Sequence, residues 1–109
     1  MRKRKLNESY IQRECVRYAK ARGYWARKFS SPGRRSVPDY IFSKKFGQAQ
    51  VMWLEEFKAE GEKPSTLQLR EHTRCRNAGW IVHPDTGRLG RDDIMNFEAR
   101  IDALEGIYA

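Results

Sequence analysis

The pattern of apolar and polar positions predicts a central strand from Gln50 to Lys58, whose first half is apolar and rich in residues that favour strands. Side chains in a strand alternate between faces, so Leu54, Glu56 and Lys58 share one face. Both faces are largely apolar, which indicates a strand covered on both sides. Glu56 and Lys58 continue a buried face, where a charge needs a partner charge, a metal ion or hydrogen bonds. A structural ion pair at the strand end is the simplest explanation.

Two of the predicted helices carry clear start signals. Asn7 is a favourable N-cap for the first helix, and Gly23 is a favourable end. Ser65 is an N-cap for the second, and its spacing to Gln68 forms a capping box, which explains Gln68 structurally. The elements predicted beside the central strand are helices at 8–22, at 66–78 and from 92 onward, strands at 24–29, 39–42 and 80–83, and a hairpin connection at 43–49. The last helix is expected to cap the domain or to pair with another copy.

Length and charge limit the classes of protein to which this chain can belong. The 109 residues are enough for one compact domain, predicted at 7–109 behind a basic arm at 1–6. A net charge of +8 favours a polyanionic partner, most commonly a nucleic acid. A membrane partner is disfavoured, because we find no basic amphipathic helix with a continuous apolar face and no stretch of spanning length. No signal-peptide pattern is present either, so a cytoplasmic protein is expected.

The two cysteines, Cys15 and Cys75, lie far apart and have no Cys-x-x-Cys companion. This spacing argues against a zinc site, since only His72 and His83 remain as further ligands of that kind. We therefore expect both cysteines to be small, buried hydrophobic side chains in a reduced cytosol.

A candidate metal site comes from two neighbouring predicted strands. Asp39 follows Pro38 where the 39–42 strand begins, and Glu56 lies near the end of the central strand. Together with Lys58, they would bring two carboxylates and one cation to one point. Hard cations such as Mg²⁺ prefer that arrangement of oxygen ligands.

The first helix offers two acidic residues, Glu8 and Glu14, as additions to this site. Helical periodicity places Glu8 about 35° and Glu14 about 85° from the centre of the inward stripe. That stripe consists of Ile11, Cys15, Tyr18 and Ala19. Glu8 is therefore the better candidate, although a favourable charge in the first turn of a helix explains it equally well.

Basic residues near the candidate site are expected to contact phosphates. The loop at 30–37 carries Arg34 and Arg35 shortly before Asp39, and guanidinium groups match phosphate oxygens well. The further candidates are Lys28 and the arm residues Arg2, Lys3, Arg4 and Lys5. A solvated basic loop and a disordered, solubilising tail are the simpler explanations.

The order helix, three strands, helix, strand, with Asp39, Glu56 and Lys58 in place, resembles the PD-(D/E)xK nuclease superfamily. Within it, residues 7 to 83 are similar to the VRR-NUC family, in particular to its small stand-alone members in phages and bacteria. The matching segments are Glu8 with Ile11-Gln12, Pro32-Gly33-Arg34-Arg35, Pro38-Asp39, Glu56-Phe57-Lys58, Gly61, Lys63-Pro64-Ser65 and Leu67-Gln68. The resemblance implies an α/β fold of order α-β-β-β-α-β with a C-terminal helix, in which helices flank a mixed sheet. Ser36-Val37 departs from the family, whose members often have glycine beside Arg35.

The resemblance also implies an activity, namely metal-dependent hydrolysis of DNA phosphodiesters with Mg²⁺ or Mn²⁺. Asp39, Glu56 and the backbone carbonyl of Phe57 would hold the metal, with Glu8 as a further candidate ligand. Lys58 would position or activate the attacking water, and Gln68 matches a recurrent family glutamine. The implied catalytic residues are thus Glu8, Asp39, Glu56, Lys58 and Gln68.

Stand-alone members of the family are similar to dimeric enzymes that cut four-way DNA junctions. The resemblance therefore implies a homodimer that acts on branched DNA such as Holliday junctions, without a small-molecule cofactor, in a bacterial or phage-infected cell. Two alternatives stay open. One is a non-catalytic basic module that binds nucleic acid, and the other is a sequence-specific nuclease of the restriction type.

Overall fold

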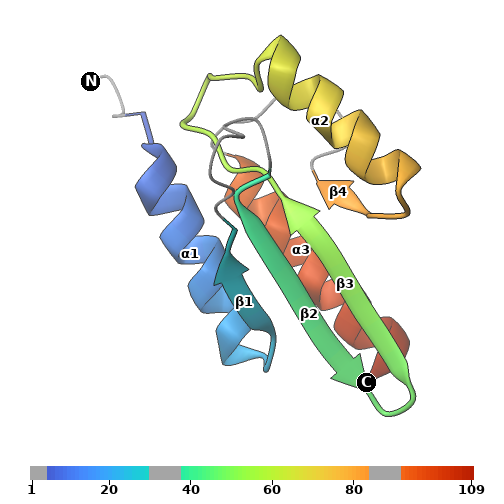
Figure 1. Ribbon diagram of the computed structural model, residues 1–109. Helices are drawn as coiled ribbons and strands as arrows, with labels where there is room; N and C mark the ends of the chain where they lie inside the picture. Colours follow the sequence, from blue (N-terminus) through green and yellow to red (C-terminus); the bar gives the residue numbers. More distant parts are fainter. Residues whose placement is uncertain (1–4, 30–37, 84–91) are drawn as a thin grey trace.

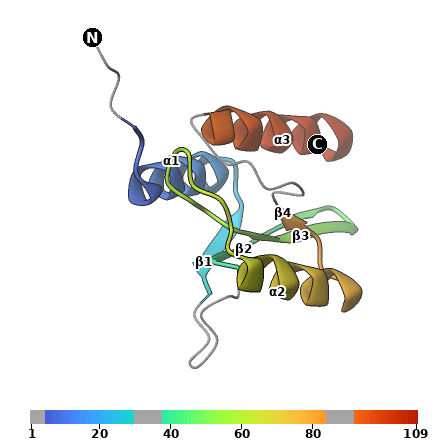
Figure 2. The same ribbon diagram turned by 90° about the horizontal axis from the view of Figure 1, so that it is seen from above.

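A mixed four-stranded sheet organises the molecule, as seen in a computed structural model that describes residues 5–29, 38–83 and 92–109. Helices α1 and α3 cover one face of this sheet, and α2 lies on the other (Figures 1 and 2). The elements in chain order are α1 (Glu8–Ala21), β1 (Trp25–Lys28), β2 (Tyr40–Phe46), β3 (Ala49–Glu55), α2 (Thr66–Asn77), β4 (Val82–His83) and α3 (Asp92–Tyr108). The predicted α/β class and element order are therefore confirmed.

The strands lie in the order β1-β2-β3-β4. The β1–β2 and β2–β3 pairs are antiparallel, whereas β4 runs parallel to β3 after the α2 crossover. Phe42 is central in this register, because it pairs with Ala26 of β1 and with Trp53 of β3. The sheet is thus mixed, as expected.

Both predicted helix starts are found in the structure. The Asn7 side chain accepts a hydrogen bond from the Tyr10 amide at 2.8 Å, which caps α1. At α2, the Ser65 hydroxyl accepts from the Gln68 amide, and the Gln68 side chain accepts from the Ser65 amide. This is the predicted capping box. None of the helices within the described ranges is long and apolar enough to cross a membrane.

The predicted hairpin is present, but its connection is shorter than the predicted 43–49. Strand β2 continues to Phe46 and β3 begins at Ala49, so only a two-residue turn remains, with Gly47 at φ +59°. The lysine that suggested a polar loop has a structural position: Lys44 Nζ donates to Glu105 at 2.5 Å and lies 4.6 Å from the ring centroid of Phe46. A long lysine stem can cover apolar surface while its ammonium group finds a partner, which composition alone does not reveal.

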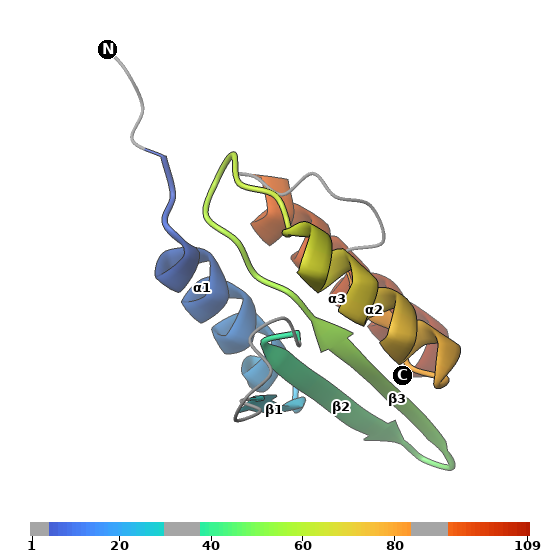
Figure 3. The same ribbon diagram turned by 45° about the horizontal axis from the view of Figure 1, so that its top comes forward.

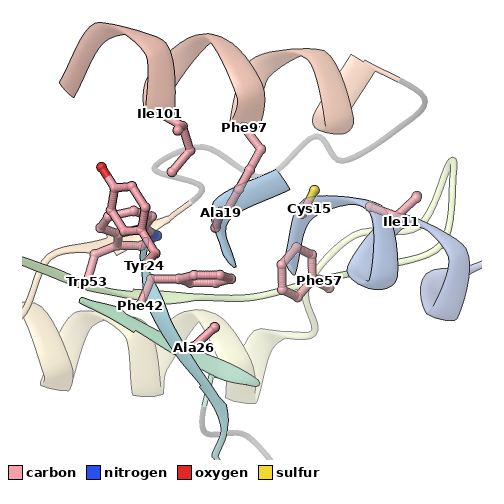
Figure 4. Packing of buried hydrophobic residues seen from close by; sticks show 10 residues of the cluster. All are labelled: Ile11, Cys15, Ala19, Tyr24, Ala26, Phe42, Trp53, Phe57, Phe97 and Ile101. Atoms are coloured by element: carbon pink, nitrogen blue, oxygen red, sulfur yellow. The ribbon is translucent and has the colours of Figure 1, made fainter. Parts of the chain in front are cut away.

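The hydrophobic core fills the space between the sheet and helices α1 and α3 (Figure 4). The ring of Phe42 stacks on Trp53 with centroids 5.3 Å apart and meets the edge of Phe97 at 5.2 Å. The buried residues from the helices are Ile11, Cys15 and Ala19 of α1 and Phe97 and Ile101 of α3. Helix α3 therefore caps the domain, one of the two roles expected of it.

Among the described residues, α2 is the element that lies on the opposite face of the sheet, and it covers this face only in part. Figure 3 shows α2 on the β3 side of the sheet, so it does not cover β1 and β2. Leu54 is buried, whereas Met52 is 39 % and Trp25 51 % exposed. The expectation that the central strand is covered on both faces is thus wrong for its first half. A helix of 12 residues that buries only His72 does not span the sheet.

Candidate active site

Asp39 and Glu56 meet at one end of the sheet. Tyr40 pairs with Glu55 in the β2–β3 register, so the next residue outward on each strand is Asp39 or Glu56. The two carboxyl groups lie within hydrogen-bonding reach of each other. Asp39 Oδ2 also accepts a hydrogen bond from the backbone N–H of Phe57 at 3.0 Å. Strand pairing therefore places the two carboxyl groups together, and a backbone donor orients one of them.

Strand alternation separates Glu56 from its neighbour Glu55. Glu55 faces the α3 side, where its Oε1 accepts from Trp53 Nε1 at 2.8 Å and from Arg100 Nη2 at 2.7 Å. Glu56 faces α2 instead. Two adjacent buried carboxyls thus have different environments, one paired with an arginine and one beside Asp39.

His72 of α2 completes the surroundings of Glu56. Its Nε2 lies 3.2 Å from Glu56 Oε1, and each side chain is only 1 % exposed. The capping box fixes the start of α2, and His72 follows Gln68 by four positions, so both lie on one helix face. The sequence alone does not single out His72 for this role. The four-residue spacing from Gln68 was the available signal.

Burial controls the protonation of the carboxyl pair. The pKa of Asp39 is raised to about 7, first by burial and then by the charge of Glu56 and the hydrogen bond to it, against the opposing effects of the Phe57 amide and Lys58. Burial likewise raises the pKa of Glu56 to about 7, while the hydrogen bond to Asp39 and the charge of Lys58 act to lower it. Near neutral pH the ionised form of this pair is therefore unfavourable, and a bound proton or cation would offset its negative charge.

Glu8 and Lys58 lie within electrostatic range of this pair. Helix α1 begins at the end of the sheet where β2 starts and β3 ends (Figure 1). Burial raises the pKa of Glu8, the charge of Asp39 adds to this, and Lys58 and Lys28 oppose it. Glu14, the rejected alternative, forms an ion pair with Arg17. Lys58 itself is half-buried and makes no direct ion pair within the described ranges.

The other predicted site residues are placed less directly. The side-chain carbonyl of Gln68 is used in the capping box, and no contact found in the described ranges joins it to Asp39 or Glu56. Its predicted site role stays a prediction, as does that of the Phe57 carbonyl. Lys5 and Lys28 are exposed, as a phosphate contact requires. The remaining predicted phosphate-binding residues lie outside the described ranges: Arg2, Lys3, Arg4, Arg34 and Arg35.

A basic groove that the sequence does not predict runs along α1. It has a volume of about 640 Å³, and Arg13, Arg17 and Lys20 contribute to its lining. Tyr40, the neighbour of Asp39, lines it as well. The groove therefore reaches the residue next to the carboxyl pair.

The donor set fits a hard divalent cation. Asp39 and Glu56 offer carboxylate oxygens at one point, and because burial raises both of their pKa values, a cation bound there would favour their ionised forms. Among the residues whose positions are described, no group of three or more His, Cys, Asp or Glu side chains is arranged to hold a metal ion. Two carboxylates are nevertheless sufficient for Mg²⁺, which usually keeps several waters and binds through one or two carboxylates plus substrate phosphate.

The chain resembles known proteins in its sequence and in its fold. No protein-family model matches it. The chain is 42 % identical over 79 residues to a protein described as "Putative nuclease p44" of Acyrthosiphon pisum secondary endosymbiont phage 1, and the match covers 72 % of this chain and 82 % of that protein. A solved structure described as "VRR_NUC domain" superposes with a TM-score of 0.65 at 28 % identity, covering 95 % of this chain and 99 % of the other.

Proposed function

This chain belongs to the VRR-NUC family of PD-(D/E)xK nucleases, and from that premise we propose that it is a Mg²⁺- or Mn²⁺-dependent endonuclease that cuts branched DNA. The observation that carries the proposal is the buried carboxyl pair at the sheet end, Asp39 and Glu56, with Lys58 and Glu8 in electrostatic range. A purely structural ion pair would not need two carboxyl groups whose pKa values are both raised.

The chemistry requires neutralising an anionic phosphodiester. A divalent ion held by Asp39 and Glu56 would supply Lewis acidity and lower the pKa of bound water. The Phe57 amide fixes the Asp39 carboxyl, and His72 holds Glu56 from the opposite side. Lys58 contributes positive charge at the phosphate, where the transition state is most negative. These residues bind and orient the reacting groups without contacting bases.

Specificity for branched DNA is proposed from the resemblance to stand-alone, junction-cutting relatives. The same resemblance supports a homodimer, in which two-fold pairing places identical sites on opposite sides of a four-way junction. The net charge of +8 supports contacts with the DNA backbone rather than with base edges.

A cleavage panel tests the proposal. Linear, flapped, forked and four-way DNA are incubated with the protein in Mg²⁺, Mn²⁺ or EDTA, and the molar mass is measured by light scattering. We expect cutting of the four-way substrate with either metal, none in EDTA, and the mass of a dimer. Cutting of linear duplex at one recognition sequence would favour a restriction-type nuclease. If Mn²⁺ supports no cleavage of any substrate, the non-catalytic binding module replaces the enzyme.

A further inference from the structure

A row of partly exposed side chains that includes Trp25 lies on the half of the sheet that α2 does not cover. Trp25 pairs in register with Ser43, and Ser43 pairs with Met52, so these three side chains form one cross-strand row. Arg27 follows on β1, and its guanidinium lies 5.5 Å from the ring centroid of Trp25. We call Trp25, Arg27, Ser43 and Met52 the sheet platform. Trp25 is 51 % and Met52 39 % exposed in the same row, and adjoining exposed apolar side chains of this kind often mark a binding surface.

The sheet platform faces the same side as the candidate active site. Side chains two apart on a strand share a face, which relates Ser43 to Asp39 on β2 and Met52 to Glu56 on β3. Glu56 contacts His72 of α2, and Met52 lines a small concavity with residues at the end of α2. Ser43 lies about 13 Å along β2 from Asp39 at about 3.3 Å per residue. This separation corresponds to about four stacked bases at about 3.4 Å each.

The positive charge around the sheet platform favours an anionic binding partner. No acidic residue occurs at 24–29 or at 40–54, whereas both segments contain cations. An aromatic ring with a guanidinium beside it offers a stacking surface for a base and a partner for its phosphate. A second copy of the chain also carries a net charge of +8, so overall charge repulsion disfavours it as the occupant.

We propose that the sheet platform binds single-stranded bases beside a branch of the DNA substrate, as flapped or forked DNA or a four-way junction opened at its centre presents them, with Trp25 stacking on a base about four positions from the scissile phosphate. The inference rests on the proposed function, because that function supplies the branched substrate. Paired duplex keeps its bases stacked inside the helix, so it gains little from this surface. The platform therefore supplies a preference for opened DNA that phosphate contacts alone do not.

The test compares Trp25→Ala and Trp25→Phe with the unchanged protein, in Ca²⁺ or EDTA so that no DNA is cut. We expect Trp25→Ala to weaken binding of branched and single-stranded DNA by about 5-fold to 100-fold, the range for removing one base-stacking aromatic. Paired linear duplex should change less than about 2-fold. Trp25→Phe keeps a ring and should retain most of the affinity. Tyr108→Ala, which removes a half-exposed aromatic of α3, is the matched control.

Fluorescence gives a second readout that does not depend on the alanine variant folding. The protein also contains Trp80, which is half-buried and lines the concavity beside Met52, so the measurement uses a Trp80→Phe variant. Single-stranded DNA should quench the tryptophan emission of this variant, and adding Trp25→Phe should remove that quenching because Trp53 is buried. Unchanged quenching, or an equal loss of branched and duplex binding, overturns the inference. A change of molar mass in Trp25→Ala overturns it in favour of a contact between copies. Cleavage is measured separately. If the protein cuts DNA but its binding does not depend on Trp25, only this inference is overturned. If binding depends on Trp25 but no DNA is cut, only the nuclease proposal is overturned.

Discussion

Asp39 is the residue whose charge the proposed chemistry needs most. Asp39→Asn keeps the shape of the side chain and an oxygen that accepts from the Phe57 amide, but it removes the charge. We expect cleavage to fall by at least about 100-fold. DNA affinity in Ca²⁺ should stay within about 3-fold, since an anion has been removed next to an anionic ligand. Lys58→Ala should likewise lose cleavage and keep most binding. Parallel losses of binding and cleavage would mean that these residues support the fold.

His72 is expected to position Glu56. His72→Leu removes the partner 3.2 Å from Glu56 Oε1 and should weaken Mn²⁺ binding by about 10-fold to 100-fold, the usual effect of losing the partner of a metal ligand. His72→Gln retains an N–H group and should recover part of the affinity. Titration calorimetry with Mn²⁺ and no DNA measures this directly. Equal Mn²⁺ affinity in His72→Leu and the unchanged protein would leave His72 with a packing role only.

Single residues also show how much of the candidate site could be predicted from the sequence. The proximity of Asp39 and Glu56 was predictable, because strand alternation and pairing place both on one face of adjacent strands. The contact between His72 and Glu56 was not, because it depends on how α2 packs on the sheet. The α1 periodicity favoured Glu8 over Glu14, and Glu8 does lie in electrostatic range of Asp39. Its role in catalysis stays a prediction.

At the scale of elements, α1 presents a row of cations to the groove beside Tyr40. Arg13, Arg17 and Lys20 recur at spacings of four and three, so they lie along one side of the helix. We expect Lys20→Ala to weaken DNA binding and to reduce the slope of log K against log salt by about 0.9, the value for one lost phosphate contact. Arg74→Ala on the exposed side of α2 is the matched control and should change the slope less. Equal slopes in both variants would show that the groove is not a DNA contact.

The predicted element bounds were wrong where a side chain is polar in composition but packs against apolar groups. Helix starts were predictable, because Asn7 and Ser65 act through local hydrogen bonds. The end of β2 was not, because Lys44 is typical of a polar loop, yet its ammonium group lies beside the rings of Tyr24 and Phe46. The cover of β3 was missed for a related reason. Its apolar pattern does not show that α2 leaves Met52 partly exposed beside Trp25.

At the scale of the whole molecule, several buried carboxyl groups lie at the end of the sheet where β2 starts and β3 ends. Ionisation of these groups lowers the stability of the fold. Burial raises the pKa values of Asp39, Glu55 and Glu56 each to about 7, from ordinary values of about 4. The folded state then binds these protons more tightly than the unfolded state does, so stability is greatest at low pH within this range and falls as pH rises from about 4 to about 7. Burial lowers the pKa of His72, which acts in the opposite direction below about pH 6.5.

The same argument predicts how a metal changes stability. In EDTA, the melting temperature should fall between pH 5 and pH 8, because three buried carboxyls ionise. Mn²⁺ competes with protons for Asp39 and Glu56, so it should stabilise the protein more at pH 8 than at pH 5. At about one hundred times its Kd, it contributes about 2.7 kcal/mol, a melting shift on the order of 10 °C for a domain of this size. Calorimetric scans measure both trends.

Asp39→Asn should melt higher than the unchanged protein in EDTA at pH 8, because one buried charge is gone, and should lose most of the Mn²⁺ shift. A metal shift that is equal at both pH values, or that persists in Asp39→Asn, would place the ion away from the carboxyl pair.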